Sequence, residues 1–257
     1  MLLERRHVLS MLGMGGLLTI APRASASRAE PLSLEQMMTR SAAVVAATVT
    51  SVDDRAGDKA SEPLTRVTLD VSDVLHGRTS GKAKEQLIFR GGQFPNGETV
   101  SYSNVIELLP GERYILFVRS EYYISPLLPG SGSVLRIATV GGRSVVVNQA
   151  GHGLLVSPRH GLLAVGAVAA GLEARNERLK SEPSLVAQPE PIQSLANLEL
   201  CSPVAGVFAE LRARSQKVQT SLGSFPTGPK AWPAQFLRDQ QKMALERRSL
   251  PTKEPTP

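Results

Sequence analysis

The chain has 257 residues, of which 42% are hydrophobic and 20% are charged, and 29 basic against 23 acidic residues give it a formal charge of +6. This mild basic excess does not form the dense Lys/Arg face with interleaved aromatic side chains that nucleic-acid binders use, so a nucleic-acid partner is not expected. Cys201 is the only cysteine, which excludes an intramolecular disulfide and requires a hydrophobic core of adequate size.

Residues 1–26 have the three-part layout of a secretory signal peptide. Arg5 and Arg6 form a basic start, an apolar run covers 8–21, and the small residues Ala24 and Ala26 suit a signal peptidase, which predicts cleavage after Ala26. The apolar run of about 14 residues is shorter than the roughly 20 that span a membrane, so no stable membrane anchor is expected. The mature protein is therefore predicted to be periplasmic or secreted.

The segment that begins at the two arginines reads Arg5-Arg6-His7-Val8-Leu9. It resembles the twin-arginine export consensus, which has two arginines, any residue, an apolar residue and leucine. The resemblance implies twin-arginine translocation, in which the protein is exported in the folded state. An ordinary signal for unfolded export is the alternative, and both routes end outside the cytoplasm.

The first elements predicted after the signal are a helix and two strands. Ser33 and Gln36 have the capping-box spacing, which predicts a short helix over about 34–40. β-Branched residues are frequent in 42–52 and predict a strand. Apolar and polar residues alternate over 65–75, which predicts a strand with one buried face.

Further strands are predicted where short apolar or alternating segments are separated by turn signals. They cover 86–90, 99–105, 113–119, 122–125, 134–140 and 144–148. Gly141 and Gly142 lie between the last two and predict a hairpin turn. Seven or eight short strands with one short helix predict a mainly β fold, namely a small OB-like Greek-key β-barrel over 27–148.

The composition changes after residue 148. The stretch 149–202 is rich in glycine and alanine, then in charge and proline, and is interpreted as a linker in which Cys201 behaves as a small apolar side chain. Apolar residues at helical spacing predict a C-terminal helix over 203–216, packed on or near the barrel. The tail 217–257 is proline-rich and is expected to be largely disordered.

No motif in the sequence predicts catalysis, a cofactor or a metal ion. There is no Gly-x-Ser-x-Gly elbow and no phosphate-binding loop, and the paired glycines are interpreted as turns. His152 and His160 lie beside glycines and are the candidate metal pair, but their spacing fits no recognised ligand pattern, so they are interpreted as loop histidines. The sequence therefore predicts no catalytic, cofactor-binding or metal-binding residue.

Several short segments of apolar residues and glycine follow one another in a defined order: 34–41 with 44–49, 67–71 with 74–77, Arg90-Gly91-Gly92, 110–117 and 208–214. Together they resemble a family of uncharacterised exported bacterial proteins, some of which accompany secreted zinc proteases of the matrixin type. Their order is also similar to the OB-type barrel of tissue inhibitors of metalloproteinases and netrin-like modules, which implies an OB-like fold. Those inhibitors place an N-terminal cysteine on the catalytic zinc, whereas the mature start here is Ser27-Arg28-Ala29-Glu30, so that mechanism is not expected.

These observations predict an exported, non-enzymatic binding protein. Its loops or an open face of the barrel would contact a protein partner, either a co-exported protease or an envelope protein. One alternative is a small periplasmic hydrolase in which folding pairs two of the carboxylates Asp70, Asp73, Glu107 and Glu112. A second alternative is a structural protein of the cell envelope, in which the tail 217–257 bridges to another component.

Overall fold

The computed structural model describes residues 32–55, 62–102, 105–130, 132–157, 159–186, 188–218, 225–231 and 233. The predicted signal peptide, with Arg5, Arg6, Ala24 and Ala26, lies outside the described residues, as does most of the tail 217–257. The described part is mainly β, as predicted, with few helices. None of its helices is both long enough and apolar enough to span a membrane.

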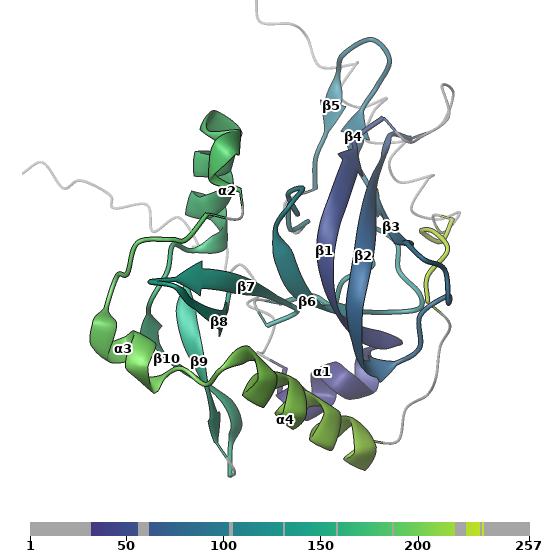
Figure 1. Ribbon diagram of the computed structural model, residues 1–257. Helices are drawn as coiled ribbons and strands as arrows, with labels where there is room; N and C mark the ends of the chain where they lie inside the picture. Colours follow the sequence, from purple (N-terminus) through teal and green to yellow (C-terminus); the bar gives the residue numbers. More distant parts are fainter. Residues whose placement is uncertain are drawn as a thin grey trace, which may run out of the picture. The chain divides into compact units, whose positions relative to one another are not determined.

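Eight antiparallel strands form one sheet in the order β10-β9-β8-β7-β6-β1-β2-β3 (Figure 1). Their bounds are β1 (Ala43–Asp53), β2 (Leu64–Gly77), β3 (Glu85–Arg90), β6 (Arg113–Val118), β7 (Val134–Val140), β8 (Arg143–Val147), β9 (His152–Ser157) and β10 (Gly161–Ala167). The two-residue strands β4 (Gly92–Gln93) and β5 (Thr99–Val100) pair separately. The prediction of a strand over 99–105 was therefore too long.

The glycine pair between β7 and β8 forms the predicted hairpin turn. Val140 pairs with Arg143, which leaves Gly141 and Gly142 as a two-residue loop, and their φ angles are 54° and 79°. Positive φ at both residues is the requirement of the type I′ loop, which matches the twist of the flanking strands, and glycine adopts positive φ without strain.

The helices are α1 (Leu34–Arg40), α2 (Leu172–Ser181), α3 (Leu195–Leu200) and α4 (Val204–Lys217), with a 3₁₀ turn η1 (Pro183–Leu185). The predicted capping box is present, because Ser33 Oγ accepts from Gln36 N and Gln36 Oε1 accepts from Ser33 N. The prediction of a C-terminal helix over 203–216 is confirmed by α4, which contacts β2, β8 and β9.

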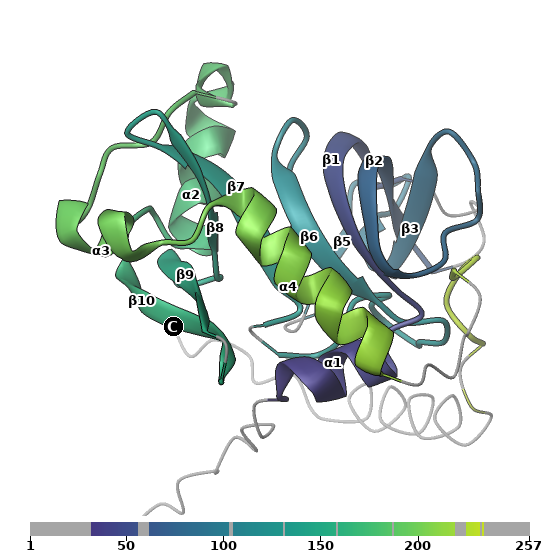
Figure 2. The same cartoon turned by 60° about the horizontal axis from the view of Figure 1, so that its bottom comes forward.

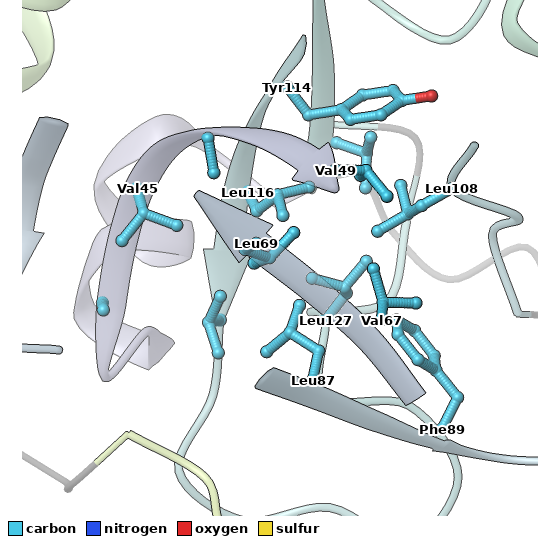
Figure 3. Close-up of a cluster of buried hydrophobic side chains, with 14 of the residues drawn as sticks. Val45, Val49, Val67, Leu69, Leu87, Phe89, Leu108, Tyr114, Leu116 and Leu127 are labelled. Atoms are coloured by element: carbon cyan, nitrogen blue, oxygen red, sulfur yellow. The ribbon is translucent and has the colours of Figure 1, made fainter. Parts of the chain in front are cut away.

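β1 lies between β2 and β6, and its first part, residues 43–49, is buried on both faces. On one face, Val45 and Val49 belong to the cluster in Figure 3, together with Leu69 of β2 and Leu116 of β6. The alternation of side chains along the strand sends the intervening residues to the opposite face. A strand covered on both faces needs a nearly continuous apolar run, which explains the dense β-branched residues of 42–52.

The opposite face of β1 is covered by helices. Val44 belongs to a second cluster with Met38 of α1 and with Val207 and Leu211 of α4, and all four side chains are fully buried. Figure 2 shows α4 lying across this side of the sheet with α1 beside it. The two helices therefore cover this second cluster, to which strand residues such as Ile115 and Ile137 also contribute.

The outer side of β3 is covered by chain from two distant segments. Arg90 N donates to Ile124 O at 2.9 Å, and Tyr122 Oη donates to Ile88 O at 2.5 Å. The segment 122–125, which was predicted as a strand, forms no regular strand because it makes these isolated contacts instead of a ladder. Phe225, in the tail that was expected to be disordered, is 6% exposed and packs into the cluster of Figure 3.

The prediction of a linker over 149–202 was wrong, because this stretch contains β9, β10, α2 and α3. Its small residues are needed for close packing. A Cβ on Gly153 of β9 would lie 2.1 Å from the Sγ of Cys201, so only glycine leaves room for that buried side chain. A glycine-rich composition therefore marked a tight contact between strand and loop and not a flexible connector.

His76, which directly follows the predicted strand 65–75, lies in β2 and is 4% exposed. Its Nδ1 lies 2.7 Å from Ser215 Oγ of α4. Burial lowers the pKa of His76 from its ordinary value of 6.5, because the buried imidazolium is poorly solvated.

This burial predicts a pH-dependent stability. Since the unfolded chain binds the proton more readily, the stability that neutral His76 contributes is fully present above pH 6.5 and is lost as the pH falls from there towards the folded pKa. We expect the free energy of unfolding of the wild type to fall between about pH 7 and about pH 5 more steeply than that of His76→Gln. Urea denaturation across this range measures both slopes, and equal slopes would contradict the prediction.

Candidate functional site

The four carboxylates proposed for hydrolase chemistry are not brought together in one cleft. Asp70 is exposed on β2, and Asp73 is bound by Arg212 of α4. Glu107 lines a cleft beside α2, whereas Glu112 lines a smaller cleft beside β7. Neither cleft contains two of the four, so the described residues do not show the pairing among them on which the hydrolase alternative depends.

The two histidines of the candidate metal pair lie at the β9–β10 hairpin. His152 is the first residue of β9, and His160 is exposed in the turn before β10. Within the described ranges, no group of three or more His, Cys, Asp or Glu side chains is placed to hold a metal ion.

Four charged residues form a buried cluster, which we call the Arg/Glu quartet: Glu112, Arg136 of β7, Arg175 of α2 and Glu190. Each is at most 6% exposed. Both Nη atoms of Arg136 donate hydrogen bonds to the carboxylate of Glu190, and the distance from Nη2 to Oε2 is 3.2 Å. Arg175 Nη2 donates to Glu112 Oε1 at 3.0 Å. Two cations and two anions balance, as buried charges require.

The quartet connects α2 and the chain after it to the sheet. Arg136 Nη2 also donates to Ala170 O at 2.8 Å, and Arg175 Nη2 donates to Leu185 O at 3.0 Å. The adjoining cleft has a volume of about 210 Å³, below the roughly 300–1,000 Å³ of typical ligand sites. We therefore interpret the quartet as a structural support that fixes the position of α2.

Sequence reasoning singled out only Glu112 among the members of the quartet. An arginine inside the otherwise uncharged strand Val134–Val140 was a signal that could have revealed Arg136, because such a residue must be paired when the strand is buried. Its partner Glu190 lies 54 positions away, in a stretch that was expected to be a linker.

A larger cleft of about 480 Å³, the α2 cleft, lies between the segment 105–107 and α2. It is lined by Val105, Ile106, Glu107, Gln149, Leu172, Glu173, Asn176 and Glu177. The Nζ atom of Lys180 lies 2.8 Å from a carboxylate oxygen of Glu107 and 3.1 Å from a carboxylate oxygen of Glu177. The hydrogen bond from Lys180 to Glu107, and then that to Glu177, raises the pKa of Lys180, so this lysine remains charged.

The end of the sheet at β10 differs from the covered end at β3. Among the described residues, β10 pairs only with β9, and its sequence Gly-Leu-Leu-Ala-Val-Gly-Ala contains no charge and no proline. Leu163 of this strand is 39% exposed, and Leu195 and Leu200 of α3 are 59% and 55% exposed. We call the outer side of β10 with these leucines the β10 edge surface.

α3 lies beside the end of β10 and does not cover the middle of the strand, where Leu163 and Ala164 are exposed. Asn197 Nδ2 donates to Ala167 O at 3.2 Å, at the last residue of the strand. The backbone groups nearer Leu163 have no such partner from α3. An unprotected strand edge is a ready template for pairing with another chain, and proteins usually protect such edges with charge, proline or a covering segment.

Comparison with protein-family models, curated proteins and solved structures gave no match. The candidate sites therefore rest on the geometry of this chain.

Proposed function

We propose that the chain is an exported, non-enzymatic binding protein that adds an extended segment of a protein partner to β10. The observation that carries the proposal is that the uncharged strand β10 has no strand paired on its outer side among the described residues. In strand addition, backbone hydrogen bonds provide affinity and alternate side chains provide specificity. The exposed leucines of the β10 edge surface would contact apolar side chains of the added strand.

Charges beside β10 define the partner further. Arg159 is exposed just before the strand begins, and Glu199 is exposed on α3 near its end. A matching segment would be extended and apolar in its centre, with an acidic residue near Arg159 and a basic residue near Glu199. A co-exported protease or an envelope protein that presents such a segment is the expected partner.

The proposal also includes a more specific fold for one part of the sheet, namely an OB-like barrel. We propose that β1, β2, β3 and β6 correspond to an OB-like barrel, similar to netrin-like and metalloproteinase-inhibitor modules, whose last gap is bridged by irregular chain. The contacts of Ile124 and Tyr122 with β3, and the bridge between Val118 and Leu127, support this view. Export by the twin-arginine route belongs to the proposal as well.

A charged residue placed on the edge tests the proposed function. The mature chain, its Ala164→Lys variant and its Ser51→Lys variant are immobilised and exposed to envelope extract. Ala164 is exposed on β10, whereas Ser51 is exposed on β1 and serves as a control with the same change of charge. We expect the wild type and Ser51→Lys to retain the same protein and Ala164→Lys to bind it at least about tenfold more weakly.

Two results would contradict the proposal. One is retention of no protein, or equal retention by the wild type and Ala164→Lys. The other is retention of the chain by itself with a dimeric mass in light scattering, which would assign the edge to self-association. Hydrogen exchange gives an independent check, because an added strand should protect the amides of β10.

A further inference from the structure

We infer that the α2 cleft is a binding site for an aliphatic chain that ends in an ammonium or guanidinium group. This site is separate from the β10 edge surface and does not depend on the function proposed for it. The ligand can be the side chain of a lysine or arginine in a peptide, or a free alkylamine. Three features of the cleft define this chemistry.

The first feature is the size and the apolar part of the lining. The volume of about 480 Å³ falls within the range of roughly 300–1,000 Å³ that is common for small-molecule sites. Val105, Ile106 and Leu172 provide apolar contact, and Leu172 is 6% exposed. This lining suits the methylene groups of an extended aliphatic chain.

The second feature is the charge of the cleft. Glu107, Glu173 and Glu177 line it, and Lys180 is the lysine that pairs with two of them. Glu173 has no ion-pair partner among the described residues. The cleft is thus negative on a chain whose formal charge is +6, so it selects cations against the charge of the protein as a whole.

The third feature is a buried acceptor without a partner. Asn176 lines the cleft although it is only 4% exposed, which places it at the floor. Its Nδ2 donates to Glu107 O at 2.9 Å, and this bond fixes the orientation of the amide. The remaining Oδ1 is buried with no hydrogen-bond partner among the described residues, and a ligand N–H at the floor would satisfy it.

NMR titration of the mature chain tests the inference with defined probes. Butylammonium and butylguanidinium are compared with neutral butanol, and the peptide acetyl-Gly-Lys-Gly-amide with its norleucine analogue. We expect the cationic probes to bind with millimolar or lower Kd and to shift the amides of 105–107 and α2, whereas the neutral probes cause no saturable shift. Tighter binding of the lysine peptide than of butylammonium would assign the natural ligand to a protein, and the reverse order would assign it to a free amine.

Matched variants localise the binding. Glu173→Gln should weaken butylammonium binding at least about threefold, because it removes the unpaired carboxylate, and added salt should weaken binding by the wild type. Asp70→Asn removes the same charge from the exposed face of β2 and should leave the Kd unchanged. Equal binding of butanol, or an unchanged Kd in Glu173→Gln, would overturn the inference.

The same variants separate this site from the proposed function. Ala164→Lys should bind butylammonium normally, whereas Glu173→Gln should still retain any partner captured through β10. Failure of one of the two proposals is therefore distinguishable from failure of the other.

Discussion

Replacing Arg136 with methionine is expected to lower the free energy of unfolding by about 3–5 kcal/mol. Arg136 is 2% exposed and binds Glu190 through two hydrogen bonds. Its loss leaves Glu190, which is 5% exposed, without its main counter-charge. The penalty reflects a buried carboxylate that has lost its partner, and urea denaturation measures it directly.

A double-mutant cycle identifies the cause of this loss. The combined variant Arg136→Met/Glu190→Leu removes both charges, so its destabilisation should be smaller than the sum of the two single effects by at least about 1 kcal/mol. The control is Lys180→Met, which breaks the ion pairs to Glu107 and Glu177 at a side chain that is 46% exposed. It should change stability by at most about 1 kcal/mol. A loss below about 1 kcal/mol in Arg136→Met would contradict the structural role of the quartet.

Replacing Leu211 with alanine is expected to lower the free energy of unfolding by about 2–5 kcal/mol. Leu211 lies on the face of α4 that packs against the sheet, and its side chain is fully buried. Truncation removes apolar contact with the cluster that includes Val44 and Met38, and it leaves a cavity that the rigid sheet cannot close.

The control is the same substitution at an exposed leucine. Leu200→Ala, at 55% exposure on α3, should change stability by no more than about 0.5 kcal/mol. Thermal or urea unfolding of both variants makes the comparison. A similar, small effect of the two substitutions would show that α4 is not part of the cooperative core.

Those elements that depend on neighbouring residues were predictable. The capping box of Ser33 and Gln36 fixed the start of α1, and the apolar runs and alternation located β1, β2 and β6 within a few residues. These patterns are readable because side-chain periodicity and helix capping involve residues close together in the chain.

In the segment 149–202, the structure depends on contacts with residues that are distant in the chain. Glycines in β9 and β10 resembled a flexible connector, but Gly153 is small because Cys201 packs against it from 48 residues further along the chain. Likewise, the tail residue Phe225 enters a core cluster built mainly by the first half of the chain. Composition alone does not indicate which distant surface a small or isolated apolar residue will meet.

The sequence by itself determined the mainly β character, the two helices α1 and α4, and the turn at Gly141 and Gly142, since each is encoded by local spacing. Only the tertiary structure decided which charges are paired and which surfaces stay open. Glu112 and Arg175 lie 63 positions apart, yet they form one buried ion pair because the sheet and α2 bring them together. Within the described part of the chain, β10 has no strand on its outer side. This edge and the α2 cleft likewise arise from the order of the strands and the packing of α2, which no local pattern encodes.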